Sequence, residues 1–284
     1  MTDAPSASVR PGYALPGSGS STSPERPRIL MYHAIAPIAD DPNRLCVSPR
    51  RFEAQMQFLK RHALRGVSVR ELLRAMGTGQ AGDLVGLTFD DAYENFLFAA
   101  VPILERFGFS ATVFAVGGML GMTNTWDERP RMRLLGADGI REAARRGMEV
   151  GSHGMSHVRL SGLRPEALEK ELVESRRELG EVLGEAVEGC CYPYGSLDRR
   201  VVRAARHAGY SYACACWTQV EGSQYDLPRP PVWEADGSLM LKAKLRLFPA
   251  YFRTTNLTTQ RGLHEVGRLV HSGAQYSVRA LSKW

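Results

Sequence analysis

The feature that most constrains this chain is a repeated alternation of short apolar runs with helical patterns, which begins at Ile29. Strands are expected at 29–33, 84–89, 111–116, 148–152, 189–192 and 210–215, with helices between them, the clearest at 165–183. Strands that alternate with helices pair in parallel through right-handed crossovers. About seven such units in about 210 residues favour an α/β fold of the distorted (β/α)-barrel type over an open sheet.

Polar residues follow four of the expected strands. They are His33, the pair Asp90 and Asp91, the pair His153 and His157, and the turn at 192–195. Because the chemistry of parallel barrels lies at the carboxyl ends of their strands, these residues are the first candidates for a site. An aspartate pair alone is more typical of a turn or a helix cap, and an H-x-x-x-H pair alone is more typical of packing. Because the aspartate pair and the histidine pair lie at the ends of different strands, their combination favours a shared site.

Asp91, His153 and His157 suit a two-histidine, one-carboxylate metal site. Imidazole and carboxylate groups bind Zn²⁺, Fe²⁺, Co²⁺, Ni²⁺ and Mn²⁺, and three protein ligands leave positions open for water and substrate. The neighbouring Asp90 is then placed to take a proton from the attacking water.

Composition narrows the class of protein further. With 44% hydrophobic and 23% charged residues, the chain has the make-up of a globular protein, and no run approaches the roughly 18 apolar residues of a membrane helix. Residues 1–28 are rich in Ser, Pro and Gly and lack the pattern of a secretory signal, so a disordered leader is expected. Five cysteines without C-x-x-C spacing argue against a structural zinc site or a disulfide framework. Free thiols favour a cytoplasmic location.

The net charge of +6 is concentrated at the C-terminal end. Residues 238–284 contain eight basic residues and one acidic residue, which leaves 28 basic and 29 acidic residues in the rest of the chain. A nearly neutral catalytic region does not indicate a nucleic-acid partner. Apolar and basic residues alternate over 239–252. The first half of this stretch suits a helix that closes the barrel, and the rest, in the basic tail, suits peripheral contact with an anionic membrane.

Three motifs resemble those of the polysaccharide deacetylases, carbohydrate esterase family 4 with a NodB homology domain. They are T-F-D-D at 88–91, S-H-G-M-S-H at 152–157 and Y-P-Y-G at 192–195. The resemblance covers about 28–248 and implies a NodB-type barrel that removes N-acetyl groups from an amino sugar with the help of one divalent metal ion. We therefore expect a leader at 1–28, a catalytic domain at 29–248 and a basic tail at 249–284.

The resemblance also implies roles for single residues. Asp90 would be the general base, and the backbone N–H of Tyr194 would belong to the oxyanion hole. Asp91, His153 and His157 would hold the metal, most simply Zn²⁺, with Co²⁺, Ni²⁺ and Mn²⁺ as alternatives.

A branch of the family that deacetylates poly-N-acetylglucosamine begins with a similar M-Y-H strand. This likeness implies that His33 is the general acid.

The chain departs from the family pattern at three positions. Ala92 stands where glycine is usual, Gly154 where threonine or serine is usual, and Cys191 where most members have an arginine that orients the base. Our hypothesis is that Arg229, in a D-L-P-R segment similar to one in the same branch, takes over this task beside Asp90. The alternative for Arg229 is a surface salt bridge.

Three other functions fit the same residues. A metal-dependent hydrolase of a non-sugar amide or imide is the first, a non-catalytic binding protein the second, and an iron oxygenase the third. The retention of both aspartates, both histidines and His33 argues against a protein that only binds. The orientation of Trp126 and Trp233, which suit either sugar stacking or core packing, would help to separate a sugar substrate from another amide.

Overall fold

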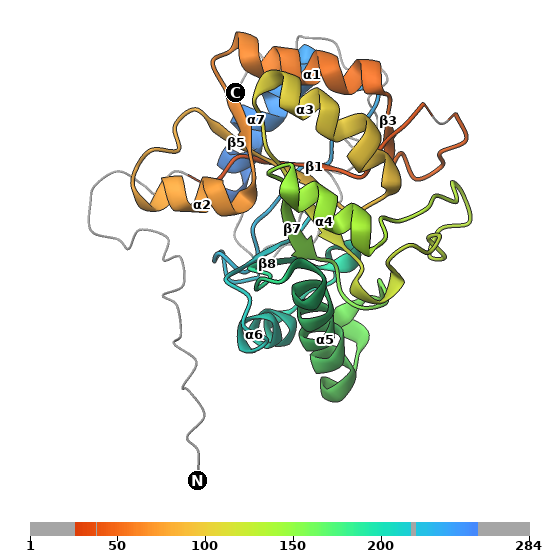
Figure 1. Cartoon of the computed structure of the whole chain (residues 1–284). Helices are drawn as coiled ribbons and strands as arrows, with labels where there is room; N and C mark the ends of the chain where they lie inside the picture. Colours follow the sequence, from red (N-terminus) through yellow and green to blue (C-terminus); the bar gives the residue numbers. More distant parts are fainter. Residues whose placement is uncertain (1–25, 38, 217–219, 255–284) are drawn as a thin grey trace.

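The computed structural model describes residues 26–37, 39–216 and 220–254, with side chains described up to residue 246. Its centre is a curled sheet of parallel strands, with helices around the outside (Figure 1). The strand order is β1-β5-β6-β7-β8-β9, and β4 also pairs with β5. These strands are β1 (Ile29–Tyr32), β4 (Arg65–Val67), β5 (Leu84–Phe89), β6 (Thr112–Ala115), β7 (Glu149–Ser152), β8 (Gly189–Cys191) and β9 (Tyr212–Cys214). The arrangement confirms the predicted (β/α)-barrel class.

Helices connect successive strands of the sheet and carry the chain back to the edge where the previous strand began, so the strands run parallel. The α-helices are α1 (Pro49–Arg61), α2 (Val69–Gly77), α3 (Val101–Phe107), α4 (Ala137–Arg145), α5 (Pro165–Leu183), α6 (Arg199–His207) and α7 (Ser238–Thr254). Side chains cap several of them: Ser48 accepts from the N–H of Arg51 at the start of α1, and Asp198 accepts from the N–H of Val201 at the start of α6. Gly184 ends α5 with a left-handed φ of 71°.

An irregular segment at 227–232 joins the two ends of the sheet. Leu227 bridges to Cys214 of β9, and Pro231 bridges to Met31 of β1, both in parallel. The N–H of Met31 donates to Pro230 at 3.0 Å, and the N–H of Val232 donates back to Met31 at 2.8 Å. Proline has no N–H to donate, so a segment that contains Pro228, Pro230 and Pro231 cannot form a continuous ladder. It nevertheless closes the barrel.

Several elements differ from the sequence-based expectations. The pattern gave no indication of β4 or α2, nor of a separate two-stranded sheet formed by β2 (Ala34–Ile35) and β3 (Cys46–Val47). These strands have two or three residues, too few to show a two-residue periodicity. The helical segment expected between the strands at 84–89 and 111–116 begins as a π-helix, η1 (Phe96–Ala100), which leads into α3.

The two predicted domain boundaries fall at different kinds of place. The first, at residue 28, immediately precedes β1, and residues 1–25 of the leader lie outside the described residues. At the second, α7 continues through residue 248 to Thr254, and the remainder of the basic tail lies outside the described residues. No described helix has both the length and the apolar character needed to cross a membrane.

All five cysteines lie in the described part of the chain, and all are free. Four of them are buried. Burial raises the pKa of Cys214 to about 12 and the pKa of Cys216 to about 11, so both thiols stay protonated at neutral pH.

The contact between β8 and β9 generates a test of the fold. Gly189 pairs with Tyr212, and a methyl group at 189 would overlap the tyrosine ring. The ring cannot easily give way, because it is buried and its hydroxyl donates to Glu149 at 2.9 Å. We expect Gly189→Ala to lower the free energy of unfolding by about 1–3 kcal/mol, measured by urea denaturation.

Gly82→Ala is the matched control, since nothing lies within 4 Å of a Cβ at that position. Its free energy of unfolding should stay within about 0.5 kcal/mol of the wild-type value. Equal effects of the two substitutions would contradict the tight packing of β8 on β9.

Candidate metal and catalytic site

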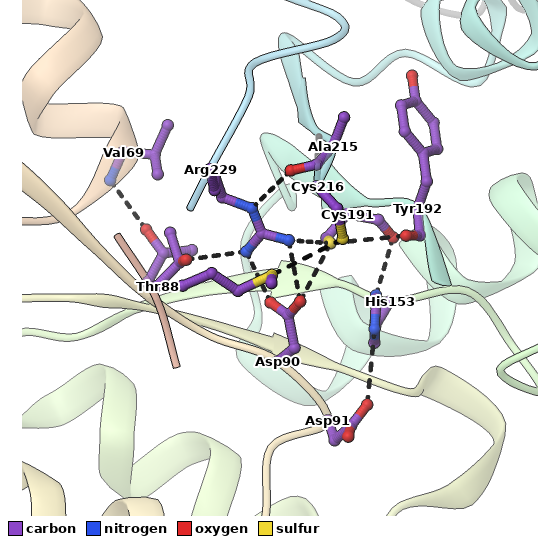
Figure 2. A network of polar contacts seen from close by, with 12 residues as sticks. Val69, Thr88, Asp90, Asp91, His153, Cys191, Tyr192, Ala215, Cys216 and Arg229 are labelled. Atoms are coloured by element: carbon purple, nitrogen blue, oxygen red, sulfur yellow. Dashed lines mark hydrogen bonds and ion pairs between the residues drawn. The ribbon is translucent and has the colours of Figure 1, made fainter. Parts of the chain in front are cut away.

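The polar residues predicted from the strand ends meet at the carboxyl edge of the barrel. Asp90 and Asp91 directly follow β5, His153 follows β7, and His33 follows β1. Figure 2 shows Asp90, Asp91 and His153 in one network with Arg229. Parallel strands place their carboxyl ends at the same edge, so residues more than 60 positions apart become neighbours.

Asp91, His153 and His157 form a compact triad. Oδ1 of Asp91 lies 3.5 Å from Nε2 of His153 and 3.2 Å from Nε2 of His157, and all three side chains are buried. Nδ1 of His153 lies 2.9 Å from the carbonyl oxygen of Cys191. A carbonyl can only accept, so Nδ1 carries the proton and the lone pair of Nε2 points to the triad.

The triad has the character of a cation site. Oδ1 of Asp91 is buried without a hydrogen-bond partner in the described structure, an arrangement that is costly unless a cation or donor meets it. Burial lowers the pKa of His153 to about 4, so its imidazole is neutral at neutral pH, as a ligand must be. Two imidazole nitrogens and one carboxylate oxygen suit a divalent metal of the zinc type. The residues present therefore fit the metal that the motifs imply.

Asp90 is engaged by a different partner. Its two oxygens accept from Nη1 and Nη2 of Arg229 at 2.7 and 2.9 Å, a bidentate pair in which both side chains are buried. Burial would raise the pKa of Asp90, but the guanidinium and then the nearby His153 hold it well below its ordinary value. Asp90 is thus an anion over the whole neutral range.

Arg229 projects from the closing segment into the barrel (Figure 2). Besides Asp90, its guanidinium donates to Oγ1 of Thr88 at 2.8 Å and to the carbonyl of Ala215 at 3.0 Å, and it contacts Sγ of Cys191 at 2.7 Å. The side chain is 0% exposed, so it does not form a surface salt bridge. The guanidinium lies beside the position where most family members carry the arginine, and Cys191 leaves room for it.

Backbone strain is concentrated at this edge of the barrel. Asp91, Ala92, His157 and Tyr194 have φ values between 54° and 70°, the left-handed region that non-glycine residues seldom adopt. The φ of 54° at Ala92 gives a physical reason for the glycine that is usual at this position.

Aromatic side chains line the triad. The ring of Trp126 stacks on the ring of His157, with centroids 4.1 Å apart and an angle of 28°, and the ring of Tyr194 meets His157 edge-on at 4.6 Å. Tyr194 is 43% exposed, on the open side of the site. Trp233 contacts the ammonium group of Lys244, which lies 4.2 Å from the centre of its ring. Of Trp126 and Trp233, Trp126 is the one with a described contact to the triad.

Two polar residues of this region were missed from the sequence. The hydroxyl of Tyr93 is buried without a hydrogen-bond partner in the described structure, and Asp91 is the charged group that most raises its pKa, after burial itself. Asp127 follows Trp126 and lies half-buried near Asp91 and His33. Both belong to segments that follow a strand, so the rule applied to the strand ends could have found them if it had been extended along each loop.

Comparisons with known proteins agree with the geometry. A polysaccharide deacetylase family model matches residues 78–213. A putative polysaccharide deacetylase, YxkH of Bacillus subtilis, is 28% identical over 189 residues, which cover 66% of this chain and 63% of that protein. A poly-beta-1,6-N-acetyl-D-glucosamine N-deacetylase of Staphylococcus aureus is 24% identical over 176 residues, 58% of this chain and 59% of that protein. The chain thus spans less than two thirds of the length of these relatives.

Solved structures share the fold. The deacetylase PplD of Streptococcus pyogenes superposes with a TM-score of 0.70 at 24% identity, over 79% of this chain and all of that one. IcaB from Ammonifex degensii gives a TM-score of 0.63 at 21% identity, over 78% and 97%. The curled barrel with an Asp-His-His triad at its strand ends has the NodB-type fold of these structures. Over residues 78–213 the chain is similar to the polysaccharide deacetylase family.

The buried pair of Asp90 and Arg229 leads to a prediction about stability. Arg229→Met leaves a buried carboxylate without its counter-charge, which costs about 3–5 kcal/mol of unfolding free energy near neutral pH. In the wild type, the lowered pKa of Asp90 contributes stability above the unfolded-state pKa of about 3.9. In Arg229→Met, burial without the guanidinium raises the pKa of Asp90. Asp90 therefore takes up a proton as the pH falls, and the loss of unfolding free energy caused by the substitution becomes smaller. Urea unfolding between pH 5 and pH 8 measures the difference in unfolding free energy between the wild type and Arg229→Met.

Two further variants complete this experiment. Arg206→Met removes an exposed arginine that pairs with Glu221 at 3.2 Å, and it should cost less than about 1 kcal/mol at every pH. Asp90→Asn combined with Arg229→Met removes both charges and should recover much of the loss. A penalty for Arg229→Met that is the same at pH 5 and pH 8 would show that the charge of Asp90 is not its cause.

Proposed function

We propose that the protein is a metal-dependent hydrolase that removes N-acetyl groups from an amino sugar. The observation that carries this proposal is the pairing of two adjacent aspartates with different partners: Asp91 with two histidines, and Asp90 with a buried arginine. One carboxylate is thus free to bind a cation while the other stays ionised next to it. Such a division suits amide hydrolysis, which needs both an activated carbonyl and a base.

In the proposed reaction, residues on the two sides of the acetyl group have separate roles. A divalent cation held by the triad would polarise the acetyl carbonyl and make a nearby water more acidic. Asp90 takes the proton of the attacking water, oriented by its two bonds to Arg229. The backbone N–H of Tyr194 donates to the carbonyl oxygen as negative charge develops on it. His33, half-buried and close enough to Asp90 and Asp91 to influence both, gives a proton to the leaving nitrogen.

Zn²⁺ is the metal that we propose, because it favours few ligands and binds imidazole and carboxylate together in hydrolytic sites. Co²⁺, Ni²⁺ and Mn²⁺ accept the same ligand set. The proposed substrate class is an N-acetylated polysaccharide, oligosaccharide or glycolipid precursor. The likeness to a relative named as a poly-beta-1,6-N-acetyl-D-glucosamine N-deacetylase supports an N-acetylglucosamine polymer as the first substrate to try.

Activity measurements test this function. We expect amine release from N-acetylglucosamine oligomers, its loss on chelation, and its return with Zn²⁺ or another of the four metals. Asp90→Asn should lower kcat by about 10²–10⁴-fold, and His33→Ala by a similar factor, because each removes a proton-transfer group. His207→Ala, at the exposed end of α6, is the control and should leave the rate unchanged.

Each outcome has its own meaning. Activity that persists after both chelation and Asp90→Asn would contradict the mechanism. Full activity of His33→Ala would contradict only the assignment of the acid. Activity on non-sugar amides but on none of the acetylated sugars would favour the alternative substrate class.

We also propose that α7 brings the protein to anionic lipid at the cytoplasmic face of a membrane. Leu239 is 71% exposed, Met240 is 37% exposed, and Lys242 and Arg246 are exposed nearby, which suits an amphipathic contact. Lys244 takes no part in such a contact, because it is buried and pairs with Asp236. The free thiols described above support the cytoplasmic side.

Flotation with liposomes measures this contact. The protein should float with anionic vesicles at low salt and remain in solution with neutral vesicles, because each basic residue near an anionic surface contributes about 1 kcal/mol. Lys242→Glu should reduce the floating fraction. If the protein stays in solution equally with anionic and with neutral vesicles, the proposed lipid contact is wrong.

A further inference from the structure

The loop between β6 and α4 brings Trp126 and Asp127 to the triad. Asn124 holds the base of this loop: its side chain accepts from the N–H of Met132 at 2.7 Å and donates to the carbonyl of Pro130 at 3.2 Å. At the other end, the stacking of Trp126 on His157 places the loop against a metal-ligand candidate. Asp127, the next residue, is therefore held beside the triad rather than left on a free loop.

A second loop meets the first one. This loop connects β2, which directly follows His33, with β3. Nδ2 of its Asn43 donates to Oδ1 of Asp127 at 2.7 Å, and its Asp40 pairs with Arg129 at 2.8 Å. The first contact orients the carboxylate of Asp127. It also ties the triad side of the site to the segment that carries His33.

The charges around Asp127 show which space it faces. Burial raises the pKa of Asp127, Asp91 raises it further, and His157 and His33 oppose the rise. Asp127 in turn is the charged group that most raises the pKa of Tyr194, after burial. The carboxylate therefore lies among the triad, the candidate acid and the exposed aromatic residue of the site.

The described contacts leave the carboxylate of Asp127 without a salt bridge. Asp127 is in neither of the two described groups whose ligand atoms converge, Asp91 with His153 and His157, and Asp90 with His153 and Cys191. Asp127 accepts hydrogen bonds from Asn43 and Asn124, and in the described part of the chain no Lys or Arg side chain pairs with it. The loop does not depend on Asp127 for its shape, because the two hydrogen bonds of Asn124 already hold its base. A partly buried carboxylate near a second one is costly unless other donors reach it.

We propose that Asp127 is a substrate-binding residue whose carboxylate accepts hydrogen bonds from ring hydroxyls of the sugar that carries the acetyl group. This inference rests on the proposed deacetylase function. A neutral N-acetylated sugar offers hydroxyl and amide hydrogens as donors, and the amide nitrogen is the group that His33 must reach. The hydroxyls are then the donors left for Asp127, which would orient the ring with the acetyl group towards the triad and the nitrogen towards His33.

Steady-state kinetics of Asp127→Asn on N-acetylglucosamine oligomers provide the test. Asparagine keeps the size of the side chain and an acceptor for Asn43 but loses the charge. We expect KM to rise about tenfold to a hundredfold with kcat within about threefold, because a hydrogen bond to a charged group is lost in the bound states. Metal content, the pH profile of kcat and the Tm should match the wild type. Asp40→Asn, which breaks the neighbouring exposed pair with Arg129, should leave KM unchanged.

Deoxy sugars identify the contact directly. Oligomers whose acetylated residue lacks the 3-hydroxyl or the 6-hydroxyl are compared with the parent oligomer. For the wild type, at least one deoxy oligomer should have a kcat/KM lowered by the same factor as the Asp127→Asn substitution lowers it on the parent oligomer. For the Asp127→Asn variant, the same deoxy oligomer should have almost the same kcat/KM as the parent oligomer.

Three results would overturn the inference while the wild type is active: an unchanged KM in Asp127→Asn, a loss confined to kcat with a shifted pH profile, or a loss of bound metal. The second would make Asp127 a partner of His33, and the third a part of the metal site. A wild type that is inactive on every acetylated sugar would instead overturn the proposed function, and this inference with it.

Discussion

The buried pair of Arg229 and Asp90 is the interaction on which the rest of the site depends. Removing both charges from water is costly, and the cost is offset only because the pair is bidentate and the guanidinium has further acceptors in Thr88 and Ala215. The same contacts fix the orientation of Asp90 and keep it anionic. One arginine thus serves the closure of the barrel and the state of the candidate base together.

The neighbouring aspartates have separate surroundings because the backbone turns sharply between them. Asp91 has a left-handed φ of 70°, so its side chain meets His153 and His157 while that of Asp90 meets Arg229. In an extended strand, successive side chains would point to opposite faces of the sheet, and one would leave the barrel interior. The strain at this turn is thus what allows two adjacent carboxylates to serve one cleft.

Much of the barrel and its triad could be predicted because the relevant signals are local. The six-residue run of β5 ends at Phe89, directly before Asp90, and the H-x-x-x-H spacing places His153 and His157 after β7. The rest depends on contacts through space. Strands as short as β4 carry no periodicity, and neither the placement of Arg229 beside Asp90 nor the contact between Asn43 and Asp127 follows from the pattern of either segment alone. The likeness of a short D-L-P-R segment suggested the first, and no motif suggested the second.

The closing segment at 227–232 has a consequence for any shortened form of the chain. Arg229 lies 139 residues after Asp90, beyond the end of the stretch that the family model matches. A chain that stops short of residue 229 contains β5 and Asp90 but has no Arg229 guanidinium to neutralise that carboxylate and no complete segment to bridge β9 to β1. Closure of the ring and charge compensation of Asp90 therefore depend on the same short segment, and a truncation that removes it removes both.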